Sequence, residues 1–102
     1  MAPSTGIELI AVSLEGRRAL RELRTQLGLS RATLEQRTRV GTDYMKHLES
    51  GHYPRLEASR LRRVVQVLQQ AAARRQVSAD LTRRFARVVK AVGQPRKTAV
   101  RR

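Results

Sequence analysis

Apolar residues recur at helical spacing along most of the chain. Leu20, Leu23 and Leu27 follow one another at intervals of three and four residues. This spacing predicts a helix that begins between residues 13 and 17 and ends just before Gly28, a natural helix stop. The same repetition of apolar positions over residues 57–73 and 79–92 predicts two further amphipathic helices.

Two shorter helices are predicted between residues 27 and 51. Ser30 is a suitable N-cap for a helix over residues 31–38, and a tight turn separates it from a helix that begins at residue 42 or 43. This second short helix ends at Gly51. Helices this short are stable only when they pack on each other. The apolar residues placed to supply that packing are Leu34, Val40, Met45 and Leu48. The chain therefore predicts an all-α fold, a compact bundle of about five helices.

The two ends of the chain have a different pattern. Residues 1–13 are predicted as a partly disordered N-terminal arm, residues 14–93 as the folded domain, and residues 94–102 as a flexible basic tail. Residues 7–14 are apolar at nearly every position, which favours a helix and leaves a short strand open.

The charge balance points to a polyanionic partner. Lys and Arg number 22 against 8 Asp and Glu, a net charge of +14. Such a charge repels itself unless a polyanion neutralises it; nucleic acid is the usual partner, and an anionic membrane surface is the alternative. The guanidinium group suits phosphates and guanine edges, although an Arg-rich genome would also raise the Arg count. The N-terminal residues resemble neither a signal peptide nor a membrane span, so we expect a cytoplasmic, nucleoid-associated protein without membrane contact.

Catalytic and metal-binding patterns are absent from the sequence. There is no Cys, and the two His residues have no further ligands at metal-binding spacing. No phosphate-binding loop, nucleophile elbow, HExxH motif or dinucleotide fingerprint occurs. We therefore expect no catalytic residues, no metal and no cofactor.

Three short motifs carry a family resemblance: LRELR at residues 20–24, GLS at 28–30 and LESG at 48–51. They resemble the helix-turn-helix repressors of the Cro and lambda-repressor type, also called XRE-like, over residues 20–68. The resemblance implies a lambda-repressor-like DNA-binding domain whose second short helix enters the major groove. The implied base-reading residues are Thr42, Asp43 and His47, flanked by Tyr44 and Lys46. The implied phosphate-binding residues are Ser30, Arg31, His52, Tyr53 and Arg55.

Two residues depart from the family pattern. Glu35 stands where the family prefers a small residue, and Arg39 stands where the turn commonly has Gly. If Arg39 adopts a positive φ, the cost is about 1 kcal/mol. Glu35 and Arg39 are four residues apart, and we expect them to form an ion pair.

Three further residues carry expectations of their own. We expect Glu49 to form an ion pair with a nearby Arg and Tyr44 to be exposed or half-buried. We expect Asp43 to serve as a base reader or as a first-turn carboxylate.

The sequence therefore predicts a sequence-specific transcriptional regulator, a repressor that binds double-stranded DNA as a homodimer. The predicted dimer interface is the apolar stripe of the last helix, Leu81, Phe85, Val88, Val89 and Val92; the alternative is that this stripe packs inside its own subunit. Two other functions stay open. One is an antitoxin-like or adaptor protein with a tight protein partner, which docks on residues 7–14 or on the last helix. The other is a non-specific nucleic-acid packaging protein.

Overall fold

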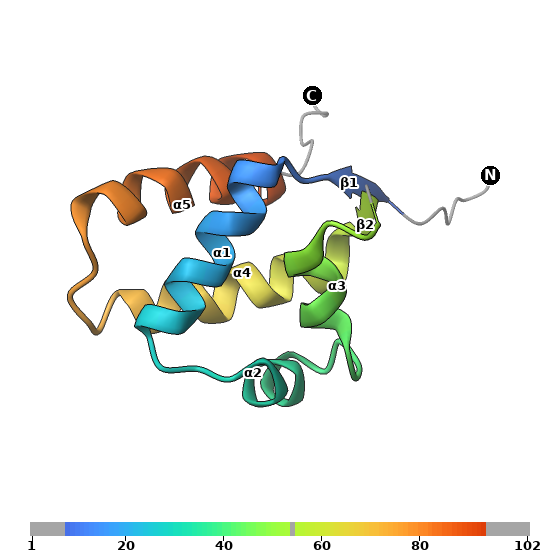
Figure 1. The fold of residues 1–102 in the computed structure, drawn as a ribbon, viewed down its shortest axis with the longest axis horizontal. Coiled ribbons are helices and arrows are strands. Elements are labelled where there is room, and N and C mark those ends of the chain that lie inside the picture. Colours follow the sequence, from blue (N-terminus) through green and yellow to red (C-terminus); the bar gives the residue numbers. More distant parts are fainter. Residues whose placement is uncertain (1–7, 54, 94–102) are drawn as a thin grey trace, which may run out of the picture.

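Five helices and a small two-stranded sheet make up the part of the chain that the computed structural model describes, residues 8–53 and 55–93. The elements follow one another in the order β1 (Leu9–Ala11), α1 (Leu14–Gln26), α2 (Arg31–Thr38), α3 (Tyr44–Ser50), β2 (Arg55–Glu57), α4 (Ala58–Ala72) and α5 (Ala79–Gly93). In Figure 1, α1 lies between α5 and α3, with α4 behind it and α2 below. The predicted helical bundle is confirmed.

Serine side chains start three of the helices. The hydroxyl oxygen of Ser13 accepts a hydrogen bond from the Gly16 N–H at 2.9 Å, and that of Ser30 accepts one from the Thr33 N–H at 3.0 Å. Ser78 accepts one from the Leu81 N–H at 3.2 Å. Each hydroxyl satisfies an N–H group that has no partner within its helix.

The helix favoured for residues 7–14 was wrong over the part of that stretch that precedes α1, because residues 8–13 are not helical. Residues 9–11 form β1, which pairs antiparallel with β2 and sets Ile10 opposite Leu56. Only Ile10 of the three strand residues turns inward, as the period of two in a strand requires. Because Ser13 caps a new helix at Leu14, the segment before it is left in extended conformation. Residues 1–6, expected to be disordered, and the predicted tail 94–102 lie outside the described residues.

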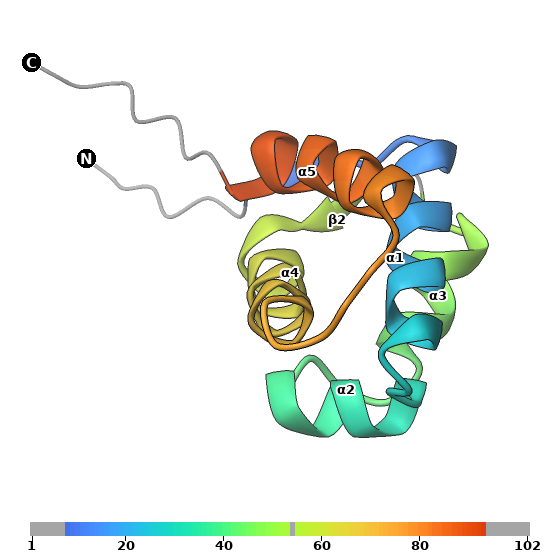
Figure 2. The same cartoon turned by 90° about the vertical axis from the view of Figure 1, so that its left-hand side faces the viewer.

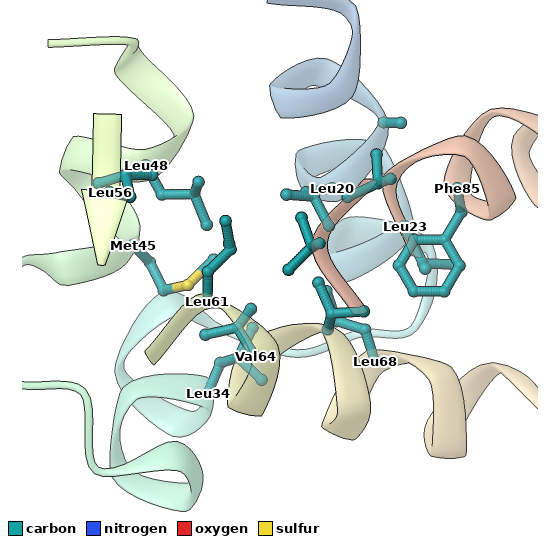
Figure 3. Packing of buried hydrophobic residues seen from close by; sticks show 14 of the residues in the cluster. Leu20, Leu23, Leu34, Met45, Leu48, Leu56, Leu61, Val64, Leu68 and Phe85 are labelled. Atoms are coloured by element: carbon teal, nitrogen blue, oxygen red, sulfur yellow. The ribbon is translucent and has the colours of Figure 1, made fainter. Parts of the chain in front are cut away.

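One hydrophobic core holds the helices together. Figure 3 shows side chains from all five helices converging on it, including Leu20, Leu34, Met45, Leu61 and Phe85. The four residues expected to pack the two short helices are all buried, as predicted: Leu34, Val40, Met45 and Leu48. Since Met45 and Leu48 fix the inner face of α3, its opposite face is directed outward.

The apolar stripe of α5 contributes to this same core. Four of its five members are buried within the chain, with exposed fractions of 1% for Leu81, 6% for Phe85, 4% for Val88 and 1% for Val92. Val89 is half-buried at the edge of the core. The stripe therefore packs inside its own subunit, which was the alternative to the predicted dimer interface.

Some of the arginine excess serves the fold itself. Arg63 donates to the carbonyl oxygen of Thr38 at the end of α2, at 2.8 Å. Arg62 donates to that of Val92 near the end of α5 at 2.9 Å, and Arg75 to that of Leu27 after α1 at 3.3 Å. Cationic donors at helix C-termini satisfy carbonyl groups and oppose the negative end of the helix dipole. These three residues are therefore already engaged before any phosphate is bound.

Candidate DNA interface

The turn between α2 and α3 contains two left-handed residues that are not glycine. Arg39 has φ 57° and ψ 37°, and its N–H donates to the carbonyl oxygen of Glu35 at 2.8 Å. Asp43, directly before α3, has φ 68°. Thr42 and Asp43 therefore belong to the turn, and α3 begins at Tyr44, slightly later than predicted. The positive φ that was considered for Arg39 is confirmed.

Glu35 caps α3 from outside the helix. Its carboxylate accepts a hydrogen bond from the Met45 N–H at 2.9 Å, whereas the Asp43 side chain makes no capping hydrogen bond. The expected ion pair between Glu35 and Arg39 is wrong, because the carboxylate turns toward α3 and Arg39 stays exposed on the turn. A carboxylate at a helix N-terminus satisfies a free N–H group and favours the positive end of the dipole. Glu35 thus ties the end of α2 to the start of α3.

Arg17 holds the other end of α3. Its side chain is buried and donates hydrogen bonds to main-chain carbonyl oxygens of the described residues, among them those of Val12 at 3.0 Å, Leu48 at 2.8 Å and Tyr53 at 2.6 Å. Burial lowers the pKa of the guanidinium from its usual high range, although the nearby Tyr44 opposes that change. One side chain thereby joins the segment before α1 to the last turn of α3 and to the loop behind it.

Sequence reasoning missed this role of Arg17. A signal was present, because Arg17 lies three residues before Leu20 and so extends the stripe of Leu20, Leu23 and Leu27. Arg18 and Arg21, also on α1, are exposed.

Glu49 forms ion pairs with two arginines on the buried side of α3. Its side chain is only 2% exposed, and its two oxygens accept from Arg24 at 2.6 Å and 3.1 Å. The Nε of Arg31 lies 3.1 Å from the same carboxylate. The expected pairing of Glu49 is confirmed, and the bidentate contact connects α1 to α3 with fixed geometry. Arg31, expected to bind phosphate, is 44% exposed at its side chain.

The outward surface of α3 and its preceding turn is polar. Thr42, Asp43 and Lys46 are exposed and His47 is half-exposed. Asp43 and Lys46 form no ion pair with any residue in the described part of the chain. The carboxylate of Asp43 can therefore accept a hydrogen bond from a bound molecule. The ammonium group of Lys46 can likewise donate one.

Tyr44 differs from the exposed or half-buried position expected of it. It is 8% exposed and belongs to the core, and its hydroxyl has no hydrogen-bond partner among the described residues. Burial is the main cause that raises the pKa of its phenol to about 12. Because the ring packs inward, Tyr44 anchors α3 and does not face outward with its neighbours.

His47, His52 and Tyr53 form an aromatic cluster at the end of α3. The ring centroids of His47 and Tyr53 are 5.0 Å apart, those of His52 and Tyr53 4.7 Å, and those of the two histidines 5.7 Å. The fold thus brings two expected phosphate-binding residues beside an expected base reader. Arg55, the third residue of this loop with an expected phosphate role, is exposed at the start of β2. The hydroxyl of Ser30 is engaged as the cap of α2.

No group of three or more His, Asp or Glu side chains within residues 8–53 and 55–93 is arranged to hold a metal ion. No described helix combines the length and the apolar character needed to cross a membrane.

Comparison with known proteins identifies the arrangement of α1 to α4. A family model described as a helix-turn-helix domain matches residues 17–76, more than half of the chain. The matched region begins at Arg17 and includes the Glu35 cap, the Glu49 ion pairs and the whole of α3. The comparisons with curated proteins and with solved structures returned no match. The resemblance expected from the sequence motifs is confirmed: the chain belongs to the helix-turn-helix domain family, a family of DNA-binding domains.

Proposed function

We propose that this protein is a sequence-specific transcriptional repressor that reads the major groove of double-stranded DNA with α3. One observation carries the proposal. The inner face of α3 is fixed by the core, by Glu35 and by Arg17. At the start of this helix, Thr42, Asp43 and Lys46 are exposed, and their side chains form no hydrogen bond or ion pair with the described residues. A rigid helix with free donors and acceptors on one face is what base recognition requires.

The base-reading residues of this proposal are Thr42, Asp43, Lys46 and His47. The carboxylate of Asp43 accepts from cytosine N4 or adenine N6, and Lys46 donates to guanine O6 or N7. The left-handed φ of Asp43 supports this role, because strained residues that persist in a fold are concentrated at functional sites. Tyr44 is left out of the set because it is buried.

Phosphate contacts supply most of the affinity in this account. Arg31, Arg55, His52 and Tyr53 flank α3 on both sides and are exposed or half-exposed. A protein that neutralises about 6–10 phosphates loses about 10³–10⁵-fold in affinity between 50 and 200 mM salt. The bound protein represses transcription by blocking RNA polymerase. This function requires the protein to be in the cytoplasm, bound to the nucleoid.

The proposal includes binding as a homodimer, because one short helix contacts too few base pairs for high affinity. In a dimer, each subunit binds one half-site, and the two half-sites lie about 34–36 Å apart. The buried stripe of α5 leaves little for a partner, so we assign the contact to the N-terminal segment. Leu9 and Leu14 there are 54% and 58% exposed, although both are large and apolar. Sedimentation of Leu9→Glu and Leu14→Glu should show folded monomers, whereas Phe85→Glu should lose helicity. A dimer that persists in both leucine variants contradicts this assignment.

Selection from random duplex DNA tests the function. The selected duplex should bind at least about 10³-fold more tightly than its shuffled version at the same salt concentration. Equal affinity for the two duplexes would instead identify a non-specific packaging protein.

A further inference from the structure

An open groove of about 930 Å³ lies between α4 and α5. The two helices run in opposite directions, and the loop that joins them lies at the far end of the molecule from α3 (Figure 1). Figure 2 shows α4 and α3 on opposite sides of the bundle. The floor of the groove is apolar and is formed by Val65, Ala72, Val77, Phe85, Ala86 and Val89. The groove therefore lies outside the surface that we assign to DNA.

The polar rim of the groove is cationic at both ends. Lys90 lies toward the end of α5, Arg75 follows α4 in the connecting loop, and no Asp or Glu lines the groove. Neither Lys90 nor Arg75 forms an ion pair within the described residues. Arg75 donates from one guanidinium nitrogen to the carbonyl oxygen of Leu27 and is otherwise exposed. Arg62, the third cation, is paired with Glu8 at 3.0 Å, and both side chains remain partly exposed. The rim thus favours an occupant with negative charge near both of its ends.

No described helix of this chain has that character. Each of the five carries at least as many Arg and Lys residues as Asp and Glu, and α4 carries no acidic residue at all. Residues 94–102 contain four Arg or Lys and no acid. A second copy of the chain would therefore place positive charge against the positive rim. Nucleic acid does not match the apolar floor, because its surface is a charged backbone with polar base edges.

We propose that this groove binds an acidic amphipathic helix of a partner protein. The stretch of α4 and its C-cap residue that lines the groove, from Arg62 to Ala73, is about 17 Å long, which accommodates about three turns of a docked helix. Apolar residues on one face of that helix fill the floor, and its acidic residues meet Lys90 and Arg75. Because the groove lies away from α3, the partner binds while the protein is on DNA, and the protein acts as an adaptor as well as a DNA reader.

Two substitutions on α5 separate this groove from the general positive field of the protein. Ala86 lines the groove and is exposed, whereas Ala91 is exposed on α5 but does not line this groove. Ala86→Glu and Ala91→Glu therefore change the net charge of the protein by the same amount. Only Ala86→Glu places the new negative charge in the groove. Both positions are exposed on a helix, so both variants should retain the wild-type circular dichroism spectrum.

The experiment begins with a displayed library of random peptides long enough for three to four helical turns, selected on the full chain at about 0.5 M salt to screen long-range attraction. We expect enriched peptides to be acidic, with apolar residues at helical spacing. Fluorescence anisotropy should show that Ala86→Glu weakens their binding at least ten-fold, while Ala91→Glu changes it less than two-fold. Equal weakening in the two variants, enrichment of basic or non-helical peptides, or no enrichment would each overturn the proposal. The DNA affinity of both variants is measured separately. Failure of the peptide-binding proposal can therefore be distinguished from failure of the proposed repressor function.

Discussion

The carboxylate of Glu35 on α2 accepts a hydrogen bond from the main-chain N–H of Met45 on α3 at 2.9 Å. It replaces the cap that Asp43 does not provide, since Asp43 makes no side-chain hydrogen bond at this helix end. The N-terminus of α3 is thus held by a residue of the preceding helix, which couples the orientation of α3 to that of α2. Asp43 is left with a free carboxylate directly beside the first turn of α3.

Removing the Glu35 cap should destabilise the fold and disturb α3. Glu35→Ala should lower the free energy of unfolding by about 1–2 kcal/mol, because the Met45 N–H loses its acceptor. Glu35→Gln retains an acceptor oxygen and should recover most of that loss. Urea denaturation of the three proteins measures the effect. Equal stability of Glu35→Ala and wild type would show that the contact does not hold α3.

Arg17 should be among the residues to which the fold is most sensitive. Arg17→Met leaves the carbonyl oxygens of Val12, Leu48 and Tyr53 without their donor, which should cost about 3 kcal/mol. Arg18→Met changes the exposed neighbour and should shift stability by less than about 0.5 kcal/mol. Thermal melts of both variants compare them directly. Similar losses in both would mean that the three hydrogen bonds contribute little.

Tyr44→Phe distinguishes an anchor from a base reader. The ring is buried and its hydroxyl has no partner in the described part of the chain. Removing the hydroxyl should therefore leave the free energy of unfolding unchanged or raise it by up to about 1 kcal/mol, with DNA affinity unaltered. Tyr44→Ala should cost about 3–5 kcal/mol, because it leaves a cavity. Loss of DNA affinity in a fully stable Tyr44→Phe protein would restore Tyr44 to the base-reading set.

Acid should weaken the contact between α1 and α5. Arg84 donates to Glu22 on α1 and to Asp80 on α5, and these hydrogen bonds lower the pKa of both carboxyl groups. A lowered pKa in the folded state adds stability above the ordinary carboxyl pKa of about 4. That stability is lost as the pH falls through the lowered value.

Comparing Arg84→Met with Arg87→Met at several pH values tests this dependence. Arg87 is exposed on the same helix and forms no ion pair among the described residues. Arg84→Met should lose less stability between neutral pH and pH about 3 than wild type, and Arg87→Met should follow wild type. Identical pH dependence in all three proteins would remove Arg84 from this role.

The local elements of the fold were predictable because their signals are local. The Leu20 stripe, the Ser30 cap and the Gly51 stop each act within a few residues, so α1, α2 and α3 appeared near their observed bounds. The pairing of β1 with β2 joins segments far apart in the sequence, and three residues per strand give no periodic signal. The sequence left residues 7–14 open between helix and strand for the same reason.

The contacts that orient the site were less predictable than its residue types. The same carboxylate of Glu35 had two partners within reach, and only the packing of α2 on α3 selects Met45 over Arg39. The acceptors of Arg17 are main-chain carbonyl groups, which carry no signal in the amino-acid pattern. The stripe of α5 had one pattern and two interpretations, since an apolar face is the same whether its own subunit or a partner covers it.

The central claim is that the outward residues at α3 read bases, and Asp43 tests it most directly. Asn tolerates the left-handed conformation of this position, so Asp43→Asn changes the hydrogen-bonding groups with little change in backbone preference. Selection from random duplex DNA should be carried out in parallel with wild type and with Asp43→Asn. The account predicts that the two selected sites differ at one position in each half-site, because the amide both donates and accepts where the carboxylate only accepts. Recovery of the same sequence by both proteins, with affinity lowered equally on all duplexes, would contradict it.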